Sequence, residues 1–263
     1  MTTSPPFATA KALRLPRFTP LSPAAWATEG YGSGWRFLHR GREVSGIEDL
    51  YDALAGLERH REWYVIRGDV REDAPDVIRR IYRPRADVPV PHIVDADRRW
   101  LCVDIDGAPA DERCHVTQAI ELLPEWLRGA TCVWQYSSSH GVKPADQIRL
   151  HLWFWLARPV GNNSLRAWAK RLQSSMPHID PALYNPCQPH YVARPVFVGA
   201  DDPVPERLGL RRGKVDAAVP PMPELLPGAA QRELDARRFA ERQREAAARR
   251  ATMSARQGAL ASS

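Results

Sequence analysis

The stretch Trp100-Leu101-Cys102-Val103-Asp104-Ile105-Asp106-Gly107 reads as a buried strand that ends in two carboxylates. Side chains alternate across a strand, so the apolar residues between the carboxylates and before them can face a core while Asp104 and Asp106 project together from the opposite face. Two carboxylates on one face can bind one metal ion. The same spacing also occurs at solvated strand ends, so its meaning depends on the residues that follow.

A strand pair is predicted next. Residues 131–136 read as a strand, residues 137–141 interrupt it, and residues 147–156 read as its return partner. One face of the return strand is apolar, and the other face carries Gln147, Arg149, His151, Trp153 and Trp155. Arginine, histidine and two tryptophans are more than plain solvation requires, and they suit a surface that holds an anionic, partly aromatic ligand.

A third acidic residue, Asp180, follows a helix predicted over residues 164–176 and precedes Pro181. An Asp-Pro pair commonly begins a turn, so Asp180 considered alone is a turn residue. Residues 188–197 then read as another strand, with Arg194 near its middle.

Taken in this order, the three segments just described, the strand with two carboxylates, the strand pair with its interruption and the segment of Asp180, resemble the archaeo-eukaryotic primase superfamily. The resemblance is in particular to the primase-polymerase domains of plasmids, phages and integrative elements. That family is marked by an apolar strand ending in two acidic residues, then a Ser-x-His element, then a third acidic residue after a helix. The matching residues here are Asp104 and Asp106, then Ser138-Ser139-His140, then Asp180. The resemblance covers residues 60–200 and depends on the order of short motifs.

The resemblance implies an α+β (mixed α/β) fold, with a catalytic sheet of RNA-recognition-motif type beside a smaller N-terminal α/β subdomain. We expect an extended or disordered arm over residues 1–30 and a primase-polymerase-like catalytic domain over residues 31–218. Composition predicts a proline-rich linker over residues 219–228 and a basic helical tail over residues 229–263.

In that family the three acidic residues, here Asp104, Asp106 and Asp180, bind two Mg²⁺ or Mn²⁺ ions. Such a pair of ions stabilises charge on the attacking and leaving oxygens when a nucleotide joins a 3′-hydroxyl. Carboxylate oxygens favour these ions over zinc. The residues expected to bind the nucleotide are Ser138, His140, Arg149, His151 and Arg194, with His140 contacting phosphates rather than acting as a general base.

The expected function is therefore that of a DNA-directed nucleotidyltransferase, a primase or primer-extending polymerase in the replication of a mobile element. Its expected partners are a single-stranded DNA template and nucleoside triphosphates, with a replicative helicase as a further candidate and no membrane. Two alternatives remain open. A catalytically inactive nucleic-acid-binding replication protein would keep its function without Asp104 and Asp106. An Asp-x-Asp glycosyltransferase would leave Ser138, His140 and Asp180 without a role.

Charge is unevenly distributed along the 263 residues, which carry a formal net charge of +6 and a pI near 9.4. Residues 229–263 hold eight arginines and four acidic residues, a net of +4, which leaves +2 for residues 1–228. Any template groove in the globular part must therefore be a local patch rather than a general field.

Four cysteines, at 102, 114, 132 and 187, form no Cys-x-x-Cys pair, and a zinc site from Cys114, His115, Cys187 and His190 is disfavoured by its spacing. With no secretory signal or long apolar run, the cytoplasm is the expected compartment. Apolar spacing further predicts helices over residues 46–56, 75–82 and 111–127, with a break at Pro124, and a strand over residues 63–66.

Overall fold

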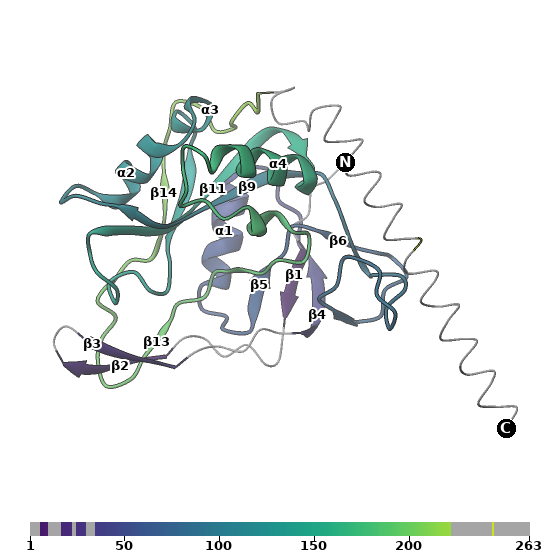
Figure 1. Ribbon diagram of the computed structural model, residues 1–263, viewed down its shortest axis with the longest axis horizontal. Helices are drawn as coiled ribbons and strands as arrows, with labels where there is room; N and C mark the ends of the chain where they lie inside the picture. Colours follow the sequence, from purple (N-terminus) through teal and green to yellow (C-terminus); the bar gives the residue numbers. More distant parts are fainter. Residues whose placement is uncertain (1–5, 10–16, 23–24, 30–34, 222–243, 245–263) are drawn as a thin grey trace, which may run out of the picture.

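The structure of the protein, a computed structural model, describes residues 6–9, 17–22, 25–29, 35–221 and 244 (Figure 1). It is a mixed α+β fold, as the sequence predicts, and its sheets are predominantly antiparallel. Across those ranges, we find no helix with the length and apolar character needed to cross a membrane. The expected linker and basic tail lie outside the described residues, apart from residues 219–221 and 244.

The helices are α1 (Ile47–Leu57), α2 (His115–Leu122), α3 (Glu125–Arg128), α4 (Asn162–Leu172) and the 3₁₀ helix η1 (Pro181–Tyr184). The strands are β1 (Pro6–Thr9), β2 (Arg17–Ser22), β3 (Ala25–Glu29), β4 (Arg36–Gly41), β5 (Trp63–Val65), β6 (Asp69–Val70), β7 (Val77–Arg79), β8 (Ile93–Val94), β9 (Arg98–Pro109), β10 (Cys132–Tyr136), β11 (Gln147–Val160), β12 (His190–Tyr191), β13 (Val196–Phe197) and β14 (Leu208–Arg211).

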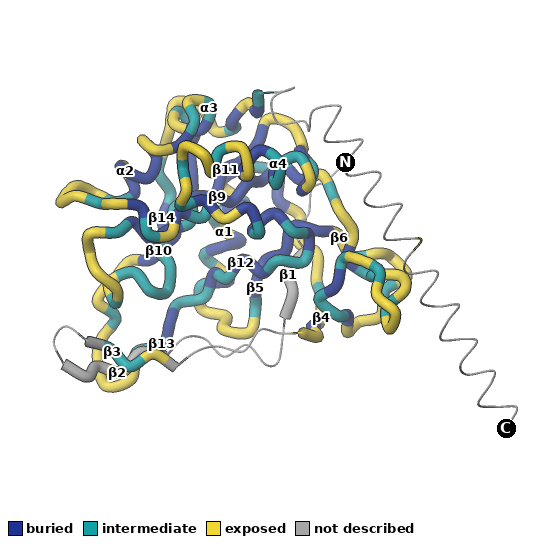
Figure 2. Tube along the Cα trace, viewed as in Figure 1, coloured by how far each residue is buried: buried dark blue, intermediate teal, exposed yellow. Residues whose placement is uncertain are grey.

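The central layer is a four-stranded antiparallel sheet in the order β14-β10-β11-β9. Its chain order is β9, α2 and α3, β10, β11, α4, then β14. Helices α2, α3 and α4 cover one face and α1 covers part of the other (Figure 1). The strands β9 and β11 are consequently buried along most of their length (Figure 2). The predicted hairpin of β10 and β11 is confirmed.

The two faces of β9 have different chemistry, because its side chains alternate. Leu101, Val103 and Ile105 pack in the core under α2 and α4. On the other face Trp100 and Cys102 pack under α1, and Asp104 and Asp106 continue the same row beyond that cover. At Gly107, with φ of +86°, a β-bulge shifts the register against β11, so the strand continues to Pro109 instead of ending at the carboxylates.

Trp153 and Trp155 lie directly opposite Cys102 and Trp100 in the neighbouring strand β11. Both indoles are buried in the core under α1. Of the two roles open to these tryptophans, stacking on a ligand base or packing under a helix, the structure shows the second, because α1 covers that end of the sheet. Arg149 and His151, further along the same row, lie beyond α1.

The second sheet is five-stranded, in the order β12-β5-β1-β4-β7. It includes β1, and β2 pairs with β3 in a smaller sheet, so the described parts of residues 1–30 are extended as expected but hydrogen-bonded into sheets. The helices predicted near residues 46–56, 111–127 and 164–176 are confirmed as α1, α2 with α3, and α4, and the strand predicted over residues 63–66 is confirmed as β5.

Two predicted elements are wrong. Residues 75–82 contain β7 rather than a helix: Ile78 and Ile81 have helical spacing and are both buried, but Ile78 is buried by pairing with Phe37 of β4. Residues 188–197 are two short strands in different sheets, β12 against β5 and β13 against β2. Arg194 lies between them, where its side chain is held by Glu58.

A buried arginine joins the two sheets. Arg67, just after β5, donates from Nε to the carbonyl of Trp100 (3.1 Å) and from Nη2 to those of Arg98 (3.3 Å) and Val160 (2.8 Å). Its Nη1 donates to Oδ1 of Asn162 at the start of α4 (3.0 Å). Burial lowers the pKa of Arg67 to about 9, partly opposed by Tyr184. One side chain thus connects β5 to β9, β11 and α4.

We predict that Arg67→Met destabilises the protein by about 3–5 kcal/mol, because four buried acceptors lose their donor while the apolar volume is kept. Urea unfolding followed by tryptophan fluorescence measures the change. Arg71→Met is the matched control, since Arg71 pairs at the surface with Asp73, and it should leave the free energy of unfolding nearly unchanged. Equal effects of the two substitutions would contradict the role of Arg67.

Candidate functional site

Two carboxylates of β9 face two basic side chains of β11. Asp104 lies opposite His151 and Asp106 lies opposite Arg149 in the strand register. The distance from His151 Nε2 to Asp104 Oδ1 is 3.4 Å, and Arg149 Nη1 forms an ion pair with Asp106. The Asp106 side chain is 62% exposed and that of Asp104 25%, whereas both basic side chains are largely buried. The carboxylates therefore line an open surface with their counter-charges behind them.

Asp180 is brought beside this pair by a short antiparallel contact between Ile105 and Ile179. The backbone N–H of Asp106 also donates to the carbonyl of His178 (3.3 Å). In such a contact Asp180 lies opposite Asp104, on the same side of the sheet. Its carboxylate accepts from the backbone N–H of Ala182 (2.8 Å) and so begins η1. Asp180 is thus both the predicted turn residue and the neighbour of Asp104.

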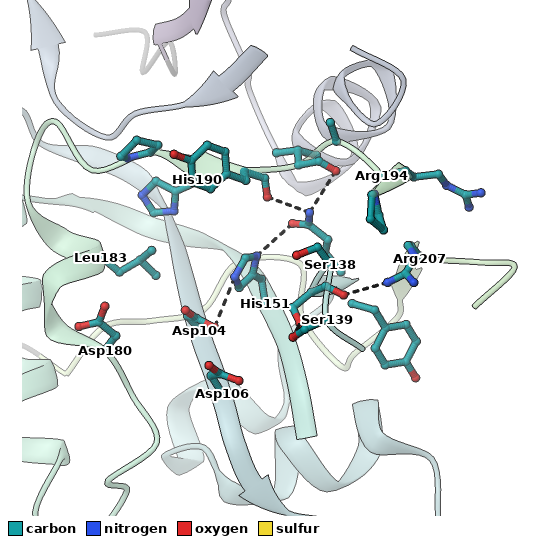
Figure 3. A pocket seen from close by; sticks show the side chains of 18 of the residues that line it. Asp104, Asp106, Ser138, Ser139, His151, Asp180, Leu183, His190, Arg194 and Arg207 are labelled. Carbon is teal, nitrogen blue, oxygen red and sulfur yellow. Dashed lines mark hydrogen bonds and ion pairs between the residues drawn. The ribbon is translucent and has the colours of Figure 1, made fainter. Parts of the chain in front are cut away.

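All three aspartates line one pocket with a cavity volume of about 260 Å³ (Figure 3). Of the expected nucleotide-binding residues, Ser138, His151 and Arg194 also line it, whereas His140 and Arg149 do not. Figure 3 shows Asp104 and Asp106 along one strand, Asp180 on the neighbouring segment, and Ser138 and Ser139 on another side of the cavity. The far wall is the segment 188–195.

The carboxylates fit a hard divalent cation by chemistry and by backbone placement, because three of them border one pocket. Within the described ranges, however, no three His, Cys, Asp or Glu side chains lie close enough together to hold a metal ion. This holds also for the residues considered for a zinc site, Cys114, His115, Cys187 and His190. Asp104 and Asp106 instead contact His151 and Arg149, so metal binding at this pocket requires side-chain rotation away from these partners.

The turn after β10 is held from behind by Arg207. Its Nη1 donates to the carbonyl of Ser137 (2.8 Å) and its Nη2 to that of His140 (3.2 Å). Asp202 binds the same guanidinium through both carboxylate oxygens. Gly141, at φ +79°, packs so closely on Val204 that a Cβ would lie 2.7 Å from its side chain. This clamp fixes the backbone of Ser138 and Ser139 at the pocket.

His140 does not line the cavity. Its ring stacks on Tyr136 at 4.0 Å between centroids and meets His115 edge-on at 5.2 Å. Burial lowers the pKa of His140 to about 4, and the positive charge of nearby His115, Arg207 and Arg149 acts in the same direction. His140 is therefore neutral at neutral pH, and in this structure it supports the turn.

Gln135 is a site residue that the sequence analysis did not single out. Its amide nitrogen donates to the carbonyls of Tyr191 (3.0 Å) and Val192 (3.2 Å) in the far wall. Its Oε1 accepts from the indole of Trp153 and lies 3.3 Å from Nδ1 of His151. Because the amide nitrogen faces two carbonyls, the amide oxygen must face His151. The sequence signal for this role is the predicted strand pair, in which Gln135 lies opposite His151 once the register is known.

His151 therefore has an acceptor at each ring nitrogen: Gln135 at Nδ1 and Asp104 at Nε2. Burial by itself lowers the pKa of His151, but Asp104, by charge and hydrogen bonding, and Asp106 raise it above its ordinary value. Two acceptors are best satisfied by a doubly protonated ring. His190, buried between Trp100 and Trp153, has the opposite environment, and burial lowers its pKa well below the ordinary value.

Arg194, expected to reach nucleotide or template, is engaged by the protein itself. Its Nε donates to Glu58 (2.8 Å) and its Nη2 to the carbonyl of Pro205 (2.8 Å). The backbone N–H of Arg194 donates to the carbonyl of Glu58 (3.0 Å). Arg194 thereby fastens the wall segment to the end of α1, while still bordering the cavity.

Fold and site together define a mixed α+β protein whose central sheet presents a carboxylate row at the mouth of a pocket, opposite a clamped serine turn. Comparison with protein-family models, with curated proteins and with solved structures finds no match in any of the three. The assignment of function therefore rests on the residues and their geometry.

The His140 environment predicts a pH dependence of stability. A folded-state pKa near 4, against 6.5 unfolded, means that the unfolded chain binds the proton more readily between these values. The contribution to stability is complete above about pH 6.5 and is lost as the pH falls toward 4, by about 1–3 kcal/mol.

The test compares urea unfolding at pH 7 and pH 4.5 for wild type and His140→Phe. Phenylalanine keeps the ring stack on Tyr136 but cannot be protonated, so the variant should lose less stability than wild type over this interval. The change in the free energy of unfolding between the two pH values is subtracted for the two proteins, and this difference removes the contributions of titrating groups that both proteins share. Identical pH dependence in the two proteins would show that His140 is not buried as described.

Proposed function

We propose that this protein is a metal-dependent, DNA-directed nucleotidyltransferase, a primase or primer-extending polymerase of the archaeo-eukaryotic primase superfamily. The observation that carries the proposal is the convergence of Asp104, Asp106, Asp180 and Ser138 on one pocket. These residues come from three separated segments, in the order that marks the family. A shared pocket is the arrangement that such a reaction needs, because carboxylates and phosphate-binding groups must face the same nucleotide.

In this proposal Asp104, Asp106 and Asp180 hold two Mg²⁺ or Mn²⁺ ions. When bound, the ions neutralise charge on the attacking and leaving oxygens of the phosphoryl transfer. Arg149 and His151 act as counter-charges to the same carboxylates before loading. This pairing reduces the mutual repulsion of Asp104 and Asp106 in the absence of metal, and loading then requires the two carboxylates to turn from these partners toward the ions.

The serine turn supplies a second part of the nucleotide site. Ser138 and Ser139 line the pocket, and in the described chain their backbone N–H groups donate to no protein acceptor. The two free amides and the hydroxyl of Ser138, on a turn held from behind by Arg207, suit the oxygens of a triphosphate. Arg207, buried and paired with Asp202, also borders this side of the pocket and holds the turn in place.

The order of strands and helices in the central sheet supports an RNA-recognition-motif type of fold. The chain runs strand, helix, two hairpin strands, helix, strand, as in ferredoxin-like folds. One pairing differs, since β14 lies beside β10 and leaves β9 at the edge of its sheet. The edge position of β9 is what allows the Ile179 segment, and with it Asp180, to lie next to the carboxylate pair.

Neither alternative function explains as much of the site. A glycosyltransferase would use Asp104 and Asp106, but the serine turn and Asp180 would have no role in it. A purely binding protein gives no reason for three carboxylates to border one pocket, because carboxylates repel a polyanion.

We predict that Asp104→Asn/Asp106→Asn, and separately Asp180→Asn, lower template-dependent nucleotide incorporation at least about a hundredfold with Mg²⁺ or Mn²⁺. Incorporation of labelled nucleotides on single-stranded DNA, with and without an annealed primer, measures this. Direct titration of Mn²⁺ by electron paramagnetic resonance should show weakened binding in the same variants.

Asp52→Asn is the matched control, because Asp52 is exposed on α1 away from the pocket, and it should keep wild-type incorporation. Product without primer would identify a primase, and product only with primer would identify an extending polymerase. Absence of incorporation in wild type under all conditions, with Mn²⁺ binding unaffected by the substitutions, would refute the proposal.

A further inference from the structure

Arginines are concentrated in two segments of the five-stranded sheet. Residues 35–42 and 77–85 together contain seven arginines and no acidic residue. Since residues 1–228 carry a net charge of only +2, the rest of that region has a net charge of −5. The positive charge of the globular part is thus local. We call the following residues the arginine surface: Trp35, Arg36, Arg40, Arg79, Arg80, Arg83 and Arg85.

Pairing of β4 with β7 places these charges side by side. Arg36 lies directly opposite Arg79 in the antiparallel register. Like charges in this position destabilise a sheet, so the arrangement is not one that folding favours. Asp87 pairs with Arg79 (2.7 Å), but among the residues the structure describes no carboxylate pairs with Arg36, Arg40, Arg83 or Arg85. The surface therefore has unneutralised charge that an anionic partner would stabilise.

An exposed indole lies among these charges. Trp35 is 41% exposed, which is unusual for a tryptophan outside a binding site. The guanidinium carbons of Arg85 and Arg79 lie 5.3 Å and 6.0 Å from its ring centroid. The backbone N–H of Arg80 donates to the carbonyl of Trp35 (2.9 Å), which holds the backbone of Trp35 beside the end of β7. A flat ring flanked by guanidinium groups suits a nucleic-acid base with its phosphates.

The arginine surface is joined to the pocket wall through Tyr82. Tyr82, between Arg80 and Arg83, donates from its hydroxyl to Oδ1 of Asn185 (3.1 Å). Tyr82, Cys187 and Tyr191 pack on the same apolar cluster, and Tyr191 lines the pocket. Residues 185–187 lead directly into the pocket wall at 188–195. The segment that contacts the arginine surface at Tyr82 is therefore the segment that forms the wall of the site.

We propose that the arginine surface binds the single-stranded template, with its phosphates on the arginines and a base stacked on Trp35. This inference rests on the proposed function and extends it from the nucleotide pocket to the path of the template. A single strand is favoured over a duplex because only an unpaired base can stack on an exposed indole. It also gives a reason for the concentration of positive charge in these two segments of an otherwise acidic globular region.

The test measures binding of a fluorescein-labelled single-stranded oligonucleotide by anisotropy, with no nucleotide or divalent ion. Arg83→Ala/Arg85→Ala should weaken binding and reduce the slope of log Kd against log salt concentration by about 1.4, the value for two lost phosphate contacts on a single strand. Trp35→Ala should weaken binding about 5- to 100-fold, and Trp35→Phe should restore most of it, because a phenyl ring still stacks.

Arg158→Ala/Lys170→Ala removes two exposed positive charges elsewhere and should leave both the affinity and the salt slope near wild type. Asp104→Asn/Asp106→Asn should bind the oligonucleotide as well as wild type does, so failure of catalysis and failure of this inference are distinguishable. Wild-type affinity in both Arg83→Ala/Arg85→Ala and Trp35→Ala would overturn the inference. An equal loss in the control variant would overturn it too, because binding would then depend on overall charge alone.

Discussion

The fold depends on one buried cation. Arg67, just after β5, donates to carbonyls at the start of β9 and at the end of β11, and to the side chain that begins α4, so three elements share its guanidinium and are joined to β5. Arg98 completes the junction by donating back to the carbonyls of Arg67 and Gly68. Apolar packing is non-directional, whereas these bonds fix position and angle. They set where β9 lies relative to the five-stranded sheet, and with it the separation of the carboxylates from the arginine surface.

Opposite charges in the site are arranged by strand register rather than by loops. Along β9 and β11 the facing pairs pass from aromatic to charged, and the change coincides with the end of the cover provided by α1. The same alternation that buries Trp100 and Trp153 under a helix therefore exposes Asp104 to the pocket. A strand shifted by one residue would exchange the two faces and leave carboxylates in the core, which makes this register strongly determined.

The sequence alone predicts most of the central layer. It also singles out three segments that border the pocket: the carboxylates of β9, the serine turn and Asp180. The alternation around Asp104 and in β11 depends on residues close in the chain, and this is why the faces could be assigned in advance. The errors have another origin. The residues around Ile78 satisfy a helical pattern, and only a partner strand distant in sequence shows that they are extended. Likewise, the contacts of Arg194, Gln135 and Arg207 join segments that no local pattern connects.

The three carboxylates are not held with equal stiffness. Asp104 and Asp106 belong to a long ladder with β11, whereas Asp180 is joined to β9 by an isolated bridge and one backbone hydrogen bond. The segment that carries Asp180 continues into η1, which packs against α4 rather than entering the sheet. The site thus consists of a half held by the strand ladder and a half held by the packing of η1, whose buried Tyr184 hydroxyl donates to the carbonyl of Cys102 (2.9 Å). Its spacing can change when the helical layer shifts by a small amount, without breaking any strand pair of the central sheet.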